Sequence, residues 1–323
     1  MWERRNALLL FGFIVFVSTI GWSQEITDDR LVTVRPEYDS AASMVISDPA
    51  LYLEGWDTLP QIRFWRKVIS LQPDSSYLSL ADTREILHTF STLGYDSLER
   101  DEKRYFKDSL RAHFNLPQEA KIYVTYGKSD FYQLRPVIPS IGKAIPIFTK
   151  EGVDPWYAQA ILLIESPGRL AESPTGAYGP FQLMRYVAVS QGLTVNRDLD
   201  ERAVFARAAM ASAGYLGRIC IPEARKIVAR RGLSVSESDI WFRLLVLHIY
   251  HAGAGNVSGA LRQIPRHITG MELIRILWKT RYRRFGNASQ NYSQVALATL
   301  LELDRLIAEE YEQICLDQEE ESD

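Results

Sequence analysis

The sequence has no excess of positive charge and only two cysteines. Its 323 residues carry a formal net charge of −3, so it lacks the basic field that draws proteins to nucleic acid. We therefore expect no DNA or RNA partner. Cys220 and Cys315 allow at most one disulfide, which would tie the C-terminal helix to the domain body. Two buried free thiols are an equally good interpretation.

Long apolar runs are absent after residue 24. Before it, Arg4 and Arg5 precede an almost unbroken apolar run from Ala7 to Ile20, and Gly21 and Ser23 place small residues at the −3 and −1 positions. This order is typical of a secretory signal peptide. We expect cleavage after residue 23 and export to the periplasm. The run is shorter than the roughly 20 residues that span a bilayer, but an uncleaved membrane anchor is the alternative.

Clusters of metal-ligating residues are also lacking. His248 and His251 lie three apart on a predicted helix. Zinc usually needs a third protein ligand, and no paired Asp, Glu or Cys has a suitable spacing. We predict no metal and no organic cofactor, with His248 packed in the core and His251 lining a cleft.

The rest of the chain divides near residue 135. Residues 24–134 predict a mostly helical accessory domain, with a loose lead-in over 25–50, a helix that opens at the capping-box pattern of 79–82, a helix over 101–113 and a short strand over 121–126. Residues 135–316 are strongly helical. The expected helices there cover 155–165, 198–218, 238–251, 256–264 and 292–315. Residues 317–323 predict a solvated, disordered acidic tail.

One glutamate ends an apolar helix. Asp154-Pro155 is typical of a helix start, and the predicted helix runs through Ile161 and Leu162 to Glu165, where Ser166-Pro167-Gly168 stops it. Apolar neighbours disfavour the carboxylate, and the negative end of the helix dipole repels it. Both effects raise the pKa of Glu165, as a general acid requires near neutral pH.

The loop after this helix combines turn formers with polar groups. It covers residues 173–184 and includes Gly176, Gly179 and Gln182. The glycines let the backbone approach a flat ligand closely, and the Gln182 amide both donates and accepts hydrogen bonds. The segment therefore predicts a ligand-facing loop, although a plain connection would look similar.

Three segments resemble the soluble lytic transglycosylase family, in the family's order. They are residues 165–184, the stretch Ile249-Tyr250-His251-Ala252-Gly253, and the stretch Ala288-Ser289-Gln290-Asn291-Tyr292-Ser293. The resemblance covers about residues 150–300. It implies an all-α fold, in which a lysozyme-like helical catalytic domain over 135–316 follows the smaller accessory domain.

The resemblance also implies an activity. Family members cleave the β-1,4 bond between N-acetylmuramic acid and N-acetylglucosamine in peptidoglycan strands and leave 1,6-anhydromuramoyl ends. Glu165 matches their single catalytic acid and base. Tyr250 would hydrogen-bond Glu165 or the substrate's acetamido group. The residues expected to line the sugar cleft are Ser173, Gly179, Gln182, Met184, Tyr250, His251 and Tyr292. The N-terminal domain is a candidate site for envelope protein partners.

Two alternatives stay open. A goose-type, lysozyme-like hydrolase would share the fold and the acid, but it would use a second carboxylate to activate water. Glu172 is the nearby candidate, although a solvated loop charge is the simpler interpretation. A non-catalytic peptidoglycan-binding or scaffold protein would keep the cleft without the chemistry. His251 in place of the family's Asn, and Ala288 in place of its Glu, favour that reading.

A basic stretch lies between the second and third segments. Seven basic residues stand there against one acid, Glu272: Arg262, Arg266, Arg275, Lys279, Arg281, Arg283 and Arg284. Such a run is usually a solvated face. Alternatively, it forms a rim that attracts the carboxylates of muramic acid and of the wall peptides.

Overall fold

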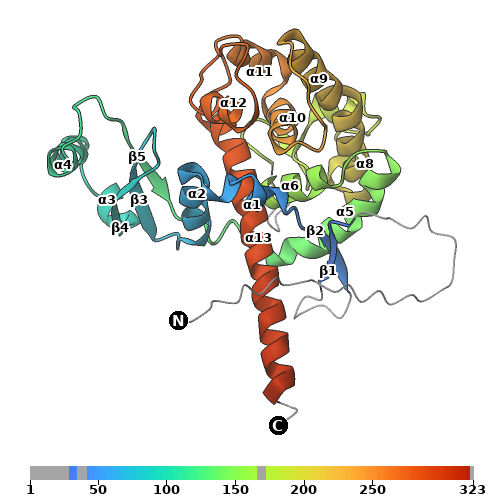
Figure 1. The fold of residues 1–323 in the computed structure, drawn as a ribbon, viewed down its shortest axis with the longest axis horizontal. Helices are drawn as coiled ribbons and strands as arrows, with labels where there is room; N and C mark the ends of the chain where they lie inside the picture. Colours follow the sequence, from blue (N-terminus) through green and yellow to red (C-terminus); the bar gives the residue numbers. More distant parts are fainter. Residues whose placement is uncertain (1–28, 35–41, 166–171, 321–323) are drawn as a thin grey trace, which may run out of the picture.

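The computed structural model describes residues 29–34, 42–165 and 172–320, with side chains up to residue 312 in the last helix. Figure 1 shows a large helical body and a small sheet-containing part, with the long helix α13 (Asn287–Glu320) running between them. The expected signal peptide, residues 1–23, lies outside the described residues. Within them, no helix combines the length and the apolar character needed to cross a membrane.

The protein is mixed α/β, so the all-α expectation is wrong. The described residues form three small antiparallel sheets. The first pairs β1 (Leu31–Val34) with β2 (Ser43–Ile46), the second places β3 (Ser75–Leu80) between β4 (Ile86–Ser91) and β5 (Ile122–Tyr126), and the third pairs β6 (Ala177–Tyr178) with β7 (Leu183–Met184). The first of these sheets lies in the expected loose lead-in.

The middle sheet overturns a predicted helix. Residues 79–82 were expected to open one, yet Ser79 and Leu80 end β3. The neighbouring Leu78 is fully buried and pairs with Val124 of β5. Burial in a small separate core therefore outweighs the local capping pattern. That core consists of Leu78, Leu87, Tyr95, Leu110 and Ile122.

Two short helices complete this small part of the molecule. They are α3 (Thr92–Asp96) and α4 (Arg100–His113). A capping box does open α4, because the Glu99 and Glu102 side chains each accept a hydrogen bond from the other's backbone N–H. The predicted helix over 101–113 and the predicted strand over 121–126 are both confirmed, as α4 and β5.

The main core is built around two helices that are buried on almost every side. These are α6 (Trp156–Glu165) and α10 (Ile240–Ala252), whose residues 156–164 and 240–249 are all buried. A helix that is apolar all round belongs inside a protein. The surrounding helices are α5 (Ile138–Lys150), α7 (Arg185–Ser190), α8 (Phe205–Tyr215), α9 (Ile221–Arg230), α11 (Ala254–Leu261), α12 (Gly270–Leu277) and α13.

Most of the predicted helices of this half are found, with shifted ends. The segment expected over 198–218 begins later, at Phe205, and α8 passes into a π-helical turn over Leu216–Cys220. Helix α13 continues to Glu320, so the backbone of residues 317–320 is helical rather than disordered. Cys220 is a buried free thiol, and the side chain of Cys315 lies outside the described residues.

A buried ion network fixes α10 against the start of α6. Arg243 of α10 is 4% exposed and binds the carboxylates of Asp48 and Asp154, each at 2.7 Å. Asp154 also accepts the backbone N–H of Trp156 at 2.9 Å and so caps α6. The helix start predicted from Asp154-Pro155 is confirmed.

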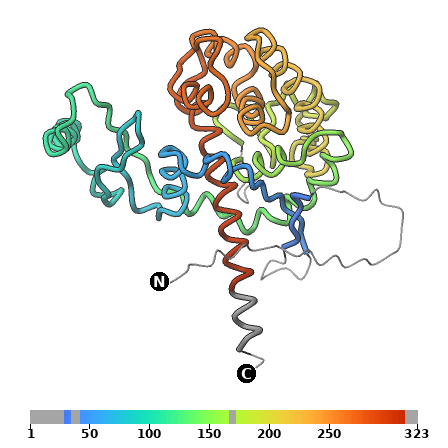
Figure 2. The backbone as a smooth tube through the Cα atoms, in the orientation of Figure 1, coloured from blue at the N-terminus to red at the C-terminus, as the bar shows by residue number. Residues whose placement is uncertain are grey.

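Elements before residue 75 belong to the main core. They include β1, β2, α1 (Ala50–Leu53) and α2 (Pro60–Ser70). The buried Gln159 amide of α6 pairs with both backbone groups of Ile46, at 2.8 and 2.7 Å. The tube in Figure 2 shows the chain leaving this core after α2 and returning before α5. At the crossing, Lys128 N–H donates to the Val68 carbonyl and Ser129 N–H to that of Leu71, both at 3.0 Å.

Candidate active site

Glu165 is the last residue of α6 and the only half-buried residue of that helix. The nine residues before it are buried, so the helix leads from the core to the site. The expected stop at Ser166-Pro167-Gly168 lies outside the described residues. The position is nevertheless the one that the sequence predicts, at the carboxyl end of an apolar helix.

The electrostatics of Glu165 match the sequence argument. Burial raises the pKa of its carboxyl to about 7. The Tyr292 hydroxyl acts in the opposite direction, because a hydrogen bond that it donates to the carboxylate lowers this pKa. Within the described residues, no neighbouring carboxylate contributes to this rise. Desolvation therefore dominates, and the carboxyl is about half protonated at neutral pH. A group in this state can both donate and accept a proton.

Three tyrosines lie within electrostatic reach of this carboxyl. Burial raises the pKa values of Tyr132, Tyr250 and Tyr292, and the negative charge of Glu165 raises each further. The Tyr292 hydroxyl is buried and has no hydrogen bond of ordinary length within the described part of the chain. A buried hydroxyl left in this way has a donor available for a ligand or for Glu165.

Tyr250 serves a different partner from the one expected. Its hydroxyl donates to the Phe181 carbonyl at 2.7 Å and lies 3.1 Å from the Ser212 hydroxyl. The expectation was a hydrogen bond to Glu165 or to the substrate. The Tyr250 hydroxyl thus fixes the 173–184 segment against α10, and the negative charge of Glu165 helps to raise its pKa. A hydrogen bond from Tyr250 to the substrate stays a prediction.

The two histidines of α10 have separate environments. His251 stacks on Tyr292 with ring centroids 4.3 Å apart, and desolvation lowers the pKa of its imidazole. His248 is fully buried, and its Nε2 lies 2.8 Å from the Ser293 hydroxyl. Among the described residues, no group of three His, Cys, Asp or Glu could hold a metal ion.

The 173–184 segment folds as a tight hairpin of β6 and β7. The Ser173 hydroxyl accepts the Ala177 N–H at 3.0 Å and so holds the turn. Gly179 has φ +82°, and a Cβ there would stand 1.9 Å from the Arg202 carbonyl oxygen. Gln182 also has a positive φ, +45°, and its side-chain amide donates to the Gly179 carbonyl at 3.1 Å. Left-handed backbone at a non-glycine residue is costly and gathers at functional sites.

Beside this hairpin lies a hollow of about 760 Å³. Met184 is half-buried and lines it together with the exposed Glu172. Of the predicted cleft residues, Tyr250 and Tyr292 therefore lie at Glu165. His251 is connected to the site by its stacking on Tyr292. The hairpin is connected to it by the hydrogen bond between the Phe181 carbonyl and Tyr250. Ser173 holds the hairpin turn, and Met184 lines the hollow beside the hairpin.

Sequence reasoning missed the residue that holds the hairpin in place. Arg202 is 5% exposed and donates to the carbonyls of Gly176 at 2.8 Å and Leu183 at 3.0 Å. Asp200 pairs with it at 2.7 Å. The buried guanidinium thus spans both strands of the hairpin. Nothing local in the sequence marks this arginine.

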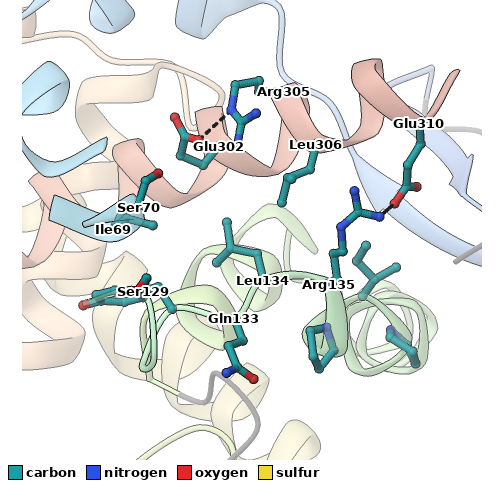
Figure 3. Close-up of a pocket in the computed structure, with 14 residues that line it drawn as sticks. Ile69, Ser70, Ser129, Gln133, Leu134, Arg135, Glu302, Arg305, Leu306 and Glu310 are labelled. Atoms are coloured by element: carbon teal, nitrogen blue, oxygen red, sulfur yellow. Dashed lines mark hydrogen bonds and ion pairs between the residues drawn. The ribbon is translucent and has the colours of Figure 1, made fainter. Parts of the chain in front are cut away.

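Tyr132 was missed as well. It follows β5, outside the segment that carries the family resemblance, yet it is one of the three tyrosines near Glu165. It also lines an apolar groove of about 630 Å³ between residues 129–139 and α13. Figure 3 shows this groove, with Leu134 and Leu306 facing each other and the Arg135–Glu310 and Arg305–Glu302 ion pairs at its edge.

No known protein family matches the chain, and no curated protein matches it either.

Proposed function

We propose that this protein is a lytic transglycosylase, with Glu165 as its single acid and base. Its substrate would be the β-1,4 bond between N-acetylmuramic acid and N-acetylglucosamine in peptidoglycan strands. The observation that carries the proposal is the Glu165 carboxyl, whose pKa burial raises to about 7 beside three tyrosines. An ordinary surface glutamate, whose pKa is about 4.5, would be ionised at neutral pH and could not protonate a leaving group.

The chemistry needs one proton that moves out and back. Protonated Glu165 donates to the glycosidic oxygen as the bond to C1 breaks. The acetamido oxygen of the same muramoyl sugar attacks C1, in a substrate-assisted step that uses no protein nucleophile. Glu165, now a carboxylate, takes the proton of the C6 hydroxyl while O6 attacks C1 and displaces the acetamido oxygen. The products are an anhydromuramoyl end and a free N-acetylglucosamine end, and no water is consumed.

The surroundings of Glu165 favour this route over hydrolysis. An inverting hydrolase needs a second carboxylate to activate water. Within the described residues, no carboxylate, Glu172 included, acts on the pKa of Glu165, and Glu172 is exposed. Tyr292 would steady Glu165 once it is ionised. The segment at residues 1–23 supports export to the periplasm, where this substrate lies.

Product analysis tests the proposal. Purified sacculi are incubated with the wild type, with Glu165→Gln and with the matched control Glu172→Gln, and the soluble products are identified by mass spectrometry. We expect anhydro ends from the wild type and the control, and none from Glu165→Gln. Reducing ends that vanish in Glu172→Gln would instead indicate a hydrolase. Binding of sacculi without cleavage by any of the three would indicate a scaffold protein.

A further inference from the structure

Three arginines from separate segments surround one cavity beyond the end of α10. Arg230 ends α9, Arg262 follows α11, and Arg283 lies in the tight turn that pairs Tyr282 with Phe285. The cavity has a volume of about 490 Å³. Its remaining lining includes residues 253–256, at the junction of α10 and α11. Sequence analysis placed Arg262 and Arg283 in one basic stretch but could not join Arg230 to them.

Tyr282 holds two of these arginines in place. The guanidinium carbons of Arg262 and Arg283 lie 5.8 and 5.4 Å from the centre of its ring. Stacking of this kind orients a guanidinium without neutralising it. The ring itself packs flush on Gly259, where a Cβ would stand 2.0 Å from a ring carbon. The platform is therefore built into the fold, because any larger residue at Gly259 would push Tyr282 away.

The cavity keeps its positive charge. Within the described residues, none of the three arginines pairs with a carboxylate. The hydrogen bonds of Arg262 go to the hydroxyls of Ser258 and Tyr282, at 3.3 and 3.4 Å. The one acid in the lining, Glu223, is paired with Lys226 at 2.7 Å. Three exposed cations around one concave surface attract an anion.

The backbone adds to this field. Helix α11 begins at Ala254 against the cavity, and no side chain caps it. The partial positive charge of the helix start therefore has the same sign as the arginines. Space is open there, because a Cβ on Gly253 or Gly255 would meet nothing within 4 Å.

We infer that this arginine cavity binds the carboxylates of the peptides attached to the muramoyl sugars. The inference rests on the proposed function. Gly253 is three residues after Tyr250, so the cavity lies at the same end of α10 as the tyrosine near Glu165. In a strand that carries peptides, the lactyl carboxyl of each muramoyl sugar is used in an amide bond, so the sugars offer no counter-charge for three arginines. A peptide carboxylate presents two oxygens that match the guanidinium fork. The cavity would thus select strands that still carry their peptides and set their position in the site.

Binding measurements test this without relying on cleavage. The full chain carrying Glu165→Gln is titrated by calorimetry with three probes: a two-repeat muropeptide with free peptide carboxylates, the same compound with those carboxylates amidated, and a peptide-free glycan of equal length whose lactyl carboxyls are amidated. The cavity variant adds Arg230→Gln, Arg262→Gln and Arg283→Gln. The control adds Arg63→Gln, Arg100→Gln and Lys150→Gln, which removes the same charge at exposed positions.

We expect the cavity variant to bind the free-carboxylate probe about tenfold more weakly at low salt, and the control to stay within about twofold. The loss should shrink as salt is added. Amidating the peptide carboxylates of the probe should weaken its binding to the protein with intact arginines by the same factor. It should not weaken binding to the cavity variant any further. Unchanged binding of the peptide-free glycan checks that the variant is folded.

Two results would overturn the inference: equal binding of the free and amidated probes, or equal binding by the cavity and control variants. The enzyme proposal fails separately. If the wild type does not cleave sacculi but the carboxylate-dependent binding persists, the cavity stands in a non-catalytic wall-binding protein. If the wild type cleaves but is indifferent to amidation, only the cavity inference is lost.

Discussion

Replacing Glu165 by Gln should make the protein more stable, and increasingly so as the pH rises. A carboxyl whose pKa is raised on folding binds its proton more tightly in the folded state, so its ionisation favours unfolding. This penalty is absent at pH values well below the ordinary pKa of 4.5 and grows until the pH passes about 7. Gln has nearly the shape of the protonated Glu side chain and stays neutral throughout.

The size of the effect follows from the two pKa values. A rise from 4.5 to about 7 corresponds to about 3 kcal/mol, at about 1.36 kcal/mol for each tenfold change in proton affinity. About 1 kcal/mol of it is present at pH 5 and nearly all of it at pH 8. The stability gained by Glu165→Gln should therefore increase by about 2.5 kcal/mol between these pH values.

Urea unfolding of both proteins at pH 5 and pH 8 measures this difference. Burial also raises the pKa of Asp304 to about 7, but that group is present in both proteins and cancels. Glu172→Gln is the control, because Glu172 is exposed and should change stability little at either pH. A gain for Glu165→Gln that is the same at both pH values would refute the desolvation argument and, with it, the assignment of Glu165 as an acid.

Three further substitutions probe the site and its support. Gly179→Ala should lower the free energy of unfolding by about 2–4 kcal/mol, because its Cβ would clash with the Arg202 carbonyl. The control Gly192→Ala, also at positive φ but in open space, should cost about 1 kcal/mol. Equal losses for the two variants would contradict the clash. Tyr292→Phe removes the group that lowers the pKa of the helix-end carboxyl, so the alkaline limb of the pH–activity curve should move up by about half a pH unit; a move downward would oppose that role. Arg243→Met should cost about 3–5 kcal/mol in urea unfolding, because it leaves the buried Asp48 without its cation and leaves Asp154 with Arg30 alone. A loss below about 1 kcal/mol would show that the network is not needed.

Local features of the chain predict the acid and the helix that carries it. The cap at Asp154 and the apolar run up to Glu165 involve neighbours within a few residues, so periodicity and capping rules identify them. The direction of the Glu165 pKa shift follows from the same run. Helices α10 and α13 are found for the same reason, because both are long and strongly apolar on their buried faces.

What the sequence could not predict depends on contacts between distant residues. The strands have six residues or fewer, and pairing across the sheet, rather than any local pattern, decides that Leu78 is in a strand. Arg202 reaches carbonyls 26 and 19 residues away. Tyr132 lies within electrostatic reach of Glu165 but comes from a segment that carries no motif. Such contacts are set by how the elements pack, which no short window of sequence contains.

The crossing point between the two parts of the chain has a practical consequence. Residues 72–127 leave and rejoin the main body at positions that already share backbone hydrogen bonds, at Val68 with Lys128 and Leu71 with Ser129. Excising that part and joining the two flanking ends with a short turn would keep this crossing, but it would remove the hydrogen bond from Arg84 to Asn291 and the packing of Tyr77 and Ile86 on the main core. A protein trimmed to start at residue 135 would instead lose the β2 edge held by Gln159 and the aromatic side chains of α2, leaving a hole in its interior.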